Sequence, residues 1–270
     1  MSERRDNLIA LIRFAALARV PGLVHTFSER TGGVSAPPFD SLNLGFRVAD
    51  DPARVIENRR RFAAAAGFAL EDVVATYQVH GVTVRAVGRS DRGTGAEAPT
   101  DEAWACDALV TAEPGVMLMG FAADCPLVLL ADGDARVAGI AHAGWRSAFG
   151  GIAARTVEAM ARLGAQPSRI VAAVTPAAQG CCYEVGAELL AALPAEAGDP
   201  AQFFRPRGGG KYLLDLPGAV RALLIAAGAG AENIDVSSAC TICEPSRFFS
   251  HRKSGGKTGR LAAVIGCKKR

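Results

Sequence analysis

The sequence predicts a mixed α/β fold in which two sheets pack together and helices cover their outer faces. Three observations support this prediction. Short apolar runs of strand length recur through the chain, whereas only three longer segments carry the start and stop signals of a helix. These strands and helices do not alternate regularly, which argues against a barrel or a simple doubly wound sheet.

The three predicted helices are bounded by capping residues, proline and glycine. The first follows Asp51-Pro52, where the acid caps the helix and the proline opens it, and it ends at Gly67. The second lies between Ser147 and Gly164. The third is expected over 216–227, because an Asp-Leu-Pro start and a glycine stop enclose an apolar segment.

The predicted strands are runs of five to eight mostly apolar residues between turn signals. They are VVATYQV (73–79), DALVT (107–111), GVMLMGFA (115–122), LVLLA (127–131), VAGIA (137–141), IVAAV (170–174), IDVSS (234–238) and LAAVIG (261–266). Their mixed order with the helices indicates two sheets with helices outside.

Composition indicates one globular domain over 1–270. Half of the residues are hydrophobic and 21% are charged. We assign 1–20 to an N-terminal extension and 194–210, rich in Pro, Gly, Ala and Arg, to a surface loop.

The net charge of +3 gives little support to nucleic-acid binding. The N-terminus lacks a long uncharged apolar core, so we expect no signal peptide, no membrane span and a cytoplasmic location.

The most informative stretch predicts a hairpin that brings a thiol and an imidazole together. Two apolar runs flank Gly133-Asp134, a pair suited to a two-residue turn. Such a turn would place Cys125 directly opposite His142, on the same face, with Cβ atoms about 4.5–5.5 Å apart. That separation suits a shared zinc ion. The prediction depends on the length of the turn, because a slip of one residue would separate the two side chains.

A tight site requires a third ligand, and the chain has only four histidines. His80 closes a predicted strand, the same placement as His142, and a glycine follows it. His25 and His251 lie in polar segments and remain rivals, because spacing favours His80 only modestly. A His-Cys-His set would leave a fourth position open, as in catalytic rather than structural zinc sites.

Motifs spread over almost the whole chain, from His25 to Gly266, resemble a known family. They are HTFSERTGGVS, FDSLNLG, DDPARVIENRRRF, QVHG, CDALVT, ADCPLVLLAD, AGIAHAGWRS and the closing FFSHR…TGR. In this order they resemble the polyphenol oxidase/YfiH family of purine nucleoside phosphorylases, which is also called laccase-domain-like.

The resemblance implies a four-layer α/β/β/α sandwich with mixed sheets, and a cytoplasmic enzyme that binds one Zn²⁺ ion. It assigns the ligands to His80, Cys125 and His142, and so selects His80 over its rivals. It also implies phosphorolysis of adenosine, inosine and S-methyl-5′-thioadenosine with inorganic phosphate as co-substrate, and deamination of adenosine. We reject the older laccase reading for this chain, because four histidines cannot furnish a multicopper set.

The implied chemistry needs groups that the sequence offers in several places. Phosphorolysis needs anion contacts, for which Arg30, in a glycine-rich turn, and Arg146 are candidates. Deamination would use a water activated by zinc and a carboxylate that shuttles protons, and Asp124 is the nearest acid in sequence. Asn43 is a candidate contact for ribose or base. Each of these residues could equally serve a turn, a cap or the surface.

Two other functions remain open at this point. Cys125 and His142 could form the nucleophile and base of a cysteine hydrolase or amidase, possibly acting on a cell-wall precursor. The chain could instead be a metal-stabilised binding protein without catalytic activity.

The remaining cysteines argue against a second metal site. Cys181-Cys182 and Cys240-Thr241-Ile242-Cys243 do not form the repeated CxxC…CxxC pattern of a four-thiolate centre.

Overall fold

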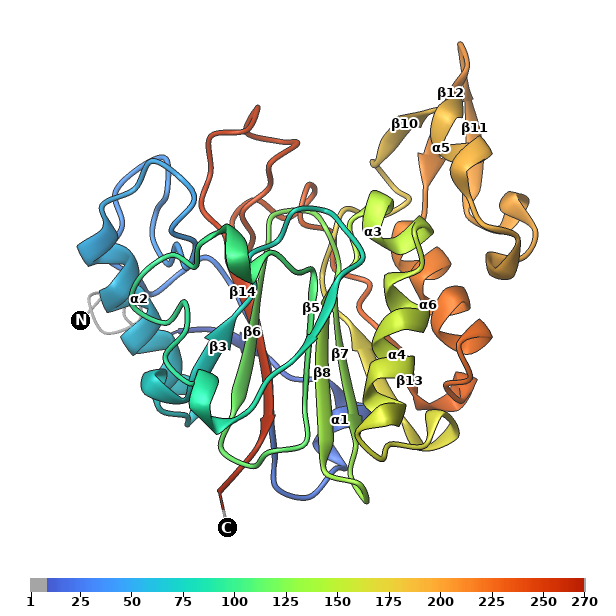
Figure 1. Cartoon of the computed structure of the whole chain (residues 1–270). Helices are drawn as coiled ribbons and strands as arrows, with labels where there is room; N and C mark the ends of the chain where they lie inside the picture. Colours follow the sequence, from blue (N-terminus) through green and yellow to red (C-terminus); the bar gives the residue numbers. More distant parts are fainter. Residues whose placement is uncertain (1–8, 270) are drawn as a thin grey trace.

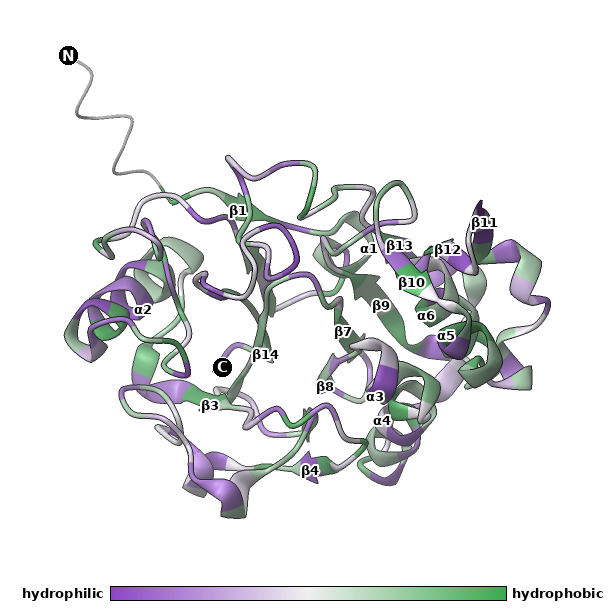
Figure 2. Ribbon diagram, turned by 90° about the horizontal axis from the view of Figure 1, so that it is seen from above, coloured by the Kyte–Doolittle hydropathy of each residue, from purple (hydrophilic) through white to green (hydrophobic). Residues whose placement is uncertain are grey.

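The computed structural model describes residues 9–269, and it confirms the predicted four-layer sandwich. Figure 1 shows two sheets face to face, with α2 outside one sheet and α4 and α6 outside the other. In Figure 2, the view from above, the hydrophobic strands lie between these helices. This arrangement covers both faces of each sheet, which explains the continuous apolar runs.

One sheet has five strands in the order β1-β2-β14-β6-β3. Its strands are β1 (Leu11–Ile12), β2 (Leu23–Ser28), β3 (Val73–Ala75), β6 (Met117–Ala122) and β14 (Leu261–Cys267). The other sheet has six strands in the order β13-β9-β7-β8-β5-β4. Its strands are β4 (Val84–Ala86), β5 (Ala108–Thr111), β7 (Leu127–Asp132), β8 (Val137–His142), β9 (Val171–Val174) and β13 (Ile234–Val236). Both sheets contain parallel and antiparallel pairs.

Successive residues of one strand fill different layers of the core. Leu127 and Leu129 of β7 point between the two sheets, where they join residues of β6 and β14. Val128 and Leu130 point the opposite way, toward α4 and α6. A third cluster joins Phe62 of α2 to the outer face of the five-stranded sheet. Period-2 alternation with both faces buried explains why β7 reads as a continuous apolar run.

Each of the three predicted helices is present. The helices are α1 (Ala15–Ala18), α2 (Pro52–Ala66), α3 (Trp145–Phe149), α4 (Ile152–Arg162), α5 (Ala187–Ala192) and α6 (Leu216–Ala226). Asp51 caps α2 by accepting the N–H of Ala53, and Gly67 ends it in the left-handed region. The second predicted helix is divided into α3 and α4, because Gly151 has a φ of +94°.

The hairpin of β7 and β8 forms, but its predicted register is wrong by two residues. Asp132 pairs with Val137, so the loop has four residues instead of two, and His142 stands opposite Leu127. Asp132 builds this longer loop by accepting the N–H groups of Asp134 and Ala135. A shift of two residues preserves the faces of a strand, whereas a shift of one would have exchanged them.

Asp132 is expected to stabilise this loop in a pH-dependent way. Burial raises the pKa of its carboxyl, but hydrogen bonds from Gln166, Ala135 and Arg169 outweigh burial and lower it. We expect Asp132→Asn to lower the free energy of unfolding by about 1–3 kcal/mol at neutral pH. The contribution is present above the unfolded pKa of about 3.9 and is lost as pH falls through the lower folded value.

Chemical denaturation of wild type and Asp132→Asn at several pH values measures the difference in their free energies of unfolding. Asp134→Asn is the matched control, because the Asp134 side chain is 79% exposed. Equal stability of wild type and Asp132→Asn at neutral pH would contradict the prediction.

Several segments carry more structure than the sequence indicated, and β2 and β4 were not among the predicted strands. The expected surface loop 194–210 contains β11 (Phe204–Gly208), which pairs with β12 (Lys211–Leu214). Strand β10 (Glu184–Gly186) completes this small sheet, which projects beyond α5 and α6. Of the expected N-terminal extension 1–20, residues 1–8 lie outside the described part, and the rest includes β1 and α1. Among the helices of residues 9–269, none has the length and apolar character to cross a membrane.

Candidate active site

The structure brings the three predicted ligands together at one end of the sheets. His80 lies in the connection from β3 to β4, Cys125 lies just before β7, and His142 ends β8. One ligand atom from each residue lies within 4.8 Å of the others. His80 is exposed, Cys125 is half-buried and His142 is buried. We call these residues the His-Cys-His group.

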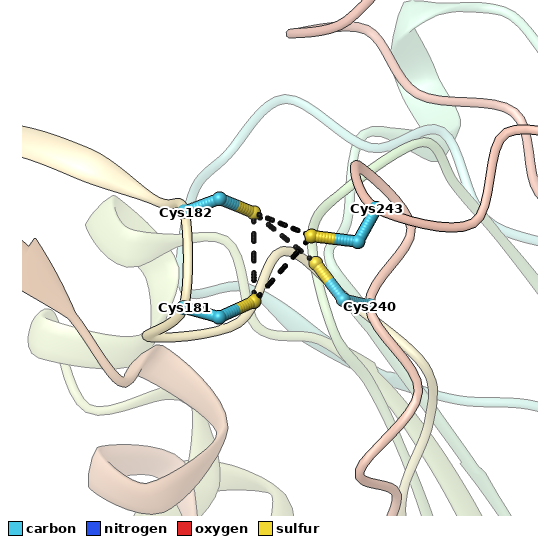
Figure 3. A group of neighbouring side chains, drawn as sticks. All are labelled: Cys181, Cys182, Cys240 and Cys243. Carbon is cyan, nitrogen blue, oxygen red and sulfur yellow. Dashed lines mark hydrogen bonds between the residues drawn. The ribbon is translucent and has the colours of Figure 1, made fainter.

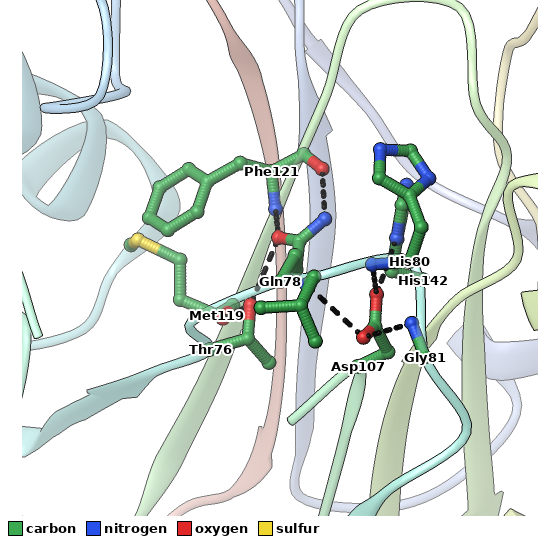
Figure 4. Close-up of polar contacts among 9 residues, drawn as sticks. Thr76, Gln78, His80, Gly81, Asp107, Met119, Phe121 and His142 are labelled. Atoms are coloured by element: carbon green, nitrogen blue, oxygen red, sulfur yellow. Dashed lines mark hydrogen bonds and ion pairs between the residues drawn. The ribbon is translucent and has the colours of Figure 1, made fainter. Parts of the chain in front are cut away.

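Asp107, which the sequence analysis did not single out, orients both histidines. Its Oδ1 lies 2.8 Å from Nδ1 of His142 and accepts the backbone N–H of His80. Its Oδ2 accepts the N–H groups of Val79 and Gly81. Figure 4 shows this carboxylate between the two histidine segments. Since Nδ1 of His142 is engaged, Nε2 is the nitrogen available to a metal.

The electrostatics of the metal-free group follow from burial and from Asp107. Burial lowers the pKa of His142, but hydrogen bonds to Asp107 and Cys125 outweigh burial and raise it to about 9. Burial and the neighbouring His142 lower the pKa of His80. A metal ion that binds at neutral pH must therefore displace a proton from His142.

The His-Cys-His group fits a zinc ion by its donor set and by the space around it. Two imidazoles and one thiolate are zinc ligands, and three of them leave a fourth position open. Gly144 keeps this space clear. A Cβ at that residue would lie 2.9 Å from Nδ1 of His80 and 3.1 Å from Sγ of Cys125.

We therefore expect Gly144→Ala to weaken zinc binding by about 10–100-fold, as for changes that disturb ligand orientation. Zinc affinity measured by competition with a chelator checks this result. Gly81→Ala is a matched control, because its Cβ would meet Asp107 and Val79 at an ordinary 3.5 Å. The expectation is wrong if both variants bind zinc as tightly as wild type.

A cavity of about 420 Å³ opens beside the His-Cys-His group. Its volume lies in the usual range for small-molecule sites. Its wall combines arginines with aromatic and amide side chains. These residues include Phe46, Arg47, Thr76, Gln78, Phe121, Asp124, Tyr183, His251, Arg252 and Arg260. The cavity can therefore receive a ligand with an anionic part and a flat apolar part.

Asp124 lines this cavity, with both carboxylate oxygens engaged. Oδ1 accepts the hydroxyl of Thr241, and Oδ2 accepts the N–H of Arg252, each at 2.7 Å. The residue has a φ of +93°, a strained conformation for a residue other than glycine. Asp124 thus ties two loops to the turn that carries Cys125. Its catalytic role stays a prediction.

The structure does not bring Arg30, Asn43 or Arg146 to the cavity wall. Arg30 binds the carbonyls of Asp40 and Pro245. Asn43 is fully buried, and its amide bonds to Gly45 and to the N–H of Arg260. Arg146 is exposed and stacks on the neighbouring Trp145. The three substrate contacts predicted for these residues stay predictions, and the structure supplies other partners for Arg30 and Asn43.

Sequence reasoning missed Asp107 and the arginines of the cavity. Asp107 precedes the buried run of β5, and the same signal, a charge at the end of an apolar strand, selected Asp124. Arg260 follows the glycine of the TGR motif, but nothing local indicates that it faces the cavity. Its position depends on Asn43, 217 residues away in the chain.

Comparison with known proteins shows the family to which the chain belongs. A family model described as "Multi-copper polyphenol oxidoreductase laccase" matches residues 24–268. The chain belongs to this family. A Deinococcus radiodurans member, named purine nucleoside phosphorylase, is 47% identical over 256 residues, which cover 94% of each chain. Purine nucleoside phosphorylase YlmD of Geobacillus stearothermophilus is 42% identical over 250 residues, which cover 91% of this chain and 90% of YlmD.

Solved structures of the laccase family confirm the fold. The crystal structure of Geobacillus stearothermophilus YlmD has a TM-score of 0.86 at 41% identity and covers 93% of both chains. That of the Bacillus licheniformis hypothetical protein YfiH has a TM-score of 0.88 at 37% identity and covers 97% of both. These structures bear out the resemblance read from the sequence motifs. The two sequence relatives named purine nucleoside phosphorylase support an enzyme.

Proposed function

We propose that this protein is a zinc-dependent purine nucleoside phosphorylase. It would cleave adenosine, inosine and S-methyl-5′-thioadenosine with phosphate, giving the base and the sugar 1-phosphate. The observation that carries the proposal is that the His-Cys-His group opens onto a cavity with both arginines and aromatic rings. The names of the relatives support purine nucleosides as the substrate class.

His80, Cys125 and His142 would hold the zinc ion, which when bound acts as a Lewis acid toward a substrate oxygen or a water. The chain's own residues set the conditions for this chemistry. Asp107 fixes the ring of His142 through Nδ1 and the backbone of His80 through its N–H. Two ligands are thereby positioned by one buried carboxylate before any substrate arrives.

Arg260 is our principal candidate for binding phosphate. It is half-buried at the cavity wall, and its Nη1 binds the carbonyls of Thr258 and Gly259. Burial lowers the pKa of its guanidinium, while Cys125 and Asp124 oppose this effect. Arg47 and Arg252 are exposed at the same wall and can add charge. Arginine suits a phosphate because its planar fork donates two parallel hydrogen bonds.

The aromatic side chains of the cavity provide a surface for a purine. Phe46, Phe121 and Tyr183 line it, and Tyr183 is braced by Arg252, whose guanidinium lies 5.1 Å from the ring centroid. A flat heterocycle packs favourably against such rings. The site would then hold base and phosphate on different parts of one wall, with the sugar between them.

Phosphate dependence tests the proposal directly. Each nucleoside is incubated with zinc-loaded protein, with and without inorganic phosphate, and free base and sugar 1-phosphate are quantified. We expect both products only when phosphate is present. We also expect Arg260→Met to raise KM for phosphate by about 10–100-fold, the loss of a charge-assisted contact. Arg155→Met is the control, since Arg155 is exposed on α4 and lies outside the cavity wall. No product from any of the three nucleosides would overturn the proposal.

Adenosine deamination is a second proposed activity, with Asp124 as the proton shuttle. The support is that Asp124 lines the cavity next to Cys125. Ammonia release from adenosine measures this reaction separately from phosphorolysis. Asp124→Asn retains the size of the side chain and should abolish ammonia release, and unchanged turnover would rule out the role.

In the alternative function, a cysteine hydrolase, Cys125 would be the nucleophile and not a zinc ligand. As a nucleophile it would be trapped by a thiol alkylator, and activity would persist without metal. Buried Asp107 against His142 resembles the orienting acid of such a site. Chelation separates the two readings, because only the zinc enzyme loses activity with its metal.

A further inference from the structure

A second cluster of sulfur atoms lies outside the His-Cys-His group. Cys181 and Cys182 precede β10, whereas Cys240 and Cys243 follow β13, yet one sulfur from each lies within 4.8 Å of the others. Figure 3 shows the four side chains converging from two loops. Folding thus brings together two cysteine pairs that lack the repeated motif, which their spacing in the sequence did not indicate.

The distances suit four thiolates around one ion better than they suit disulfides. Sγ of Cys182 lies 3.3 Å from that of Cys240 and 3.4 Å from that of Cys243. Sγ of Cys181 lies 3.6 Å from those of Cys182 and Cys243. Disulfide sulfurs lie about 2.05 Å apart. Sulfurs at the corners of a tetrahedron, with Zn–S of about 2.3 Å, lie about 3.8 Å apart.

The backbone around Cys240 supplies donors to its sulfur. N–H groups of Gln179, Ile242 and Cys243 are directed at this Sγ. The two from Ile242 and Cys243 arise because the chain turns back immediately after Cys240, where Glu244 N–H bonds to the Cys240 carbonyl. Backbone N–H donors stabilise a thiolate and lower the charge that a metal centre must carry.

We infer that Cys181, Cys182, Cys240 and Cys243 form a structural zinc site, separate from the His-Cys-His group. All four positions of a tetrahedral ion would be filled by protein, which is typical of structural rather than catalytic zinc. Thiolates select soft or borderline ions, so Zn²⁺ is favoured over Mg²⁺ or Ca²⁺.

This centre would cross-link a loop that reaches the active-site cavity to a loop that holds Asp124 of the cavity wall. Tyr183 follows the first cysteine pair and lines the cavity. Thr241 lies within the second pair and donates its hydroxyl to Asp124. Apart from sulfur, the loops are joined by few hydrogen bonds, including Thr241 N–H to the Ala177 carbonyl and Gln179 Nε2 to the Ser237 carbonyl. A bound ion would fix Tyr183 and Asp124 relative to each other.

Zinc stoichiometry of the full chain tests the inference. The protein is reduced and reconstituted with excess Zn²⁺, and unbound metal is removed. The zinc content per chain is then measured by elemental mass spectrometry. We expect two ions per wild-type chain, one for the C181S/C243S variant and one for H142A. C267A is the matched control and should retain two, because Cys267 is buried away from both groups. Equal zinc contents in wild type and C181S/C243S would overturn the inference.

A second measurement does not depend on the folding of the cysteine variant. Reduced H142A protein, which retains the four thiols, is titrated with Co²⁺. We expect one tightly bound ion with the intense sulfur-to-cobalt charge-transfer absorption of a four-thiolate site. If folded, reduced H142A binds no Co²⁺, the inference is wrong. Neither measurement uses nucleosides, so its outcome is independent of the proposed phosphorylase activity.

Discussion

His142→Ala is expected to abolish zinc binding at the His-Cys-His group and to lower phosphorolysis by about 10³-fold or more. A buried imidazole is one of only three protein ligands here, and two ligands do not hold zinc tightly. Loss of the Lewis acid removes several kcal/mol of transition-state stabilisation, and each 1.4 kcal/mol corresponds to a factor of ten. The removed ring also takes away the side-chain partner of the buried Asp107 carboxylate, which keeps its three backbone N–H donors.

The measurement combines metal content with initial rates for adenosine and phosphate. His251→Ala is the control, because His251 lines the same cavity but does not belong to the His-Cys-His group. That variant should retain its zinc. A His142→Ala protein that stays folded and turns over adenosine at the wild-type rate would exclude metal-assisted phosphorolysis at this group.

The layers of the fold could be predicted from sequence because they depend on local pattern. Apolar runs on both faces of a strand require cover on both sides, and β7 shows this, with Leu127 and Val128 in different core layers. Capping chemistry likewise located α2 and α6. The small sheet of β10, β11 and β12 escaped prediction because its strands are short and half of their residues are exposed.

The metal-ligating residues of the site were predictable from their residue types. Their pairing across the hairpin was less predictable, because it depends on strand register. Cys125 and His142 could be named from the residues and His80 from the family resemblance, although the hairpin register used to pair the first two was wrong. The pairing survived because the error was two residues, which preserves the face, and because the turn at Asp124 carries Cys125 back to the group. Long-range partners such as Asp107 with His80 leave no local pattern.

Asp107→Asn is expected to weaken zinc binding by about 10–100-fold and to destabilise the metal-free protein by about 2–4 kcal/mol. The carboxylate has no exposed surface and accepts three backbone N–H groups besides contacting Nδ1 of His142. Burial raises its pKa, but the hydrogen bonds from His142, Gly81 and Val79 outweigh burial and lower it. An amide provides one acceptor oxygen in place of two, and it removes the charge that stabilises protonated His142.

Zinc affinity and denaturation of the metal-free protein separate the two effects, and Asp72→Asn controls for the loss of a buried carboxylate elsewhere. Asp72 pairs with Arg92 and Lys269, so its variant should lose stability yet bind zinc as wild type does. If Asp107→Asn behaves in the same way, Asp107 only supports the fold. If zinc affinity also falls, the carboxylate orients the ligands. The second outcome is expected, because a neutral amide can present its N–H to Nδ1 and so favour the wrong tautomer of His142.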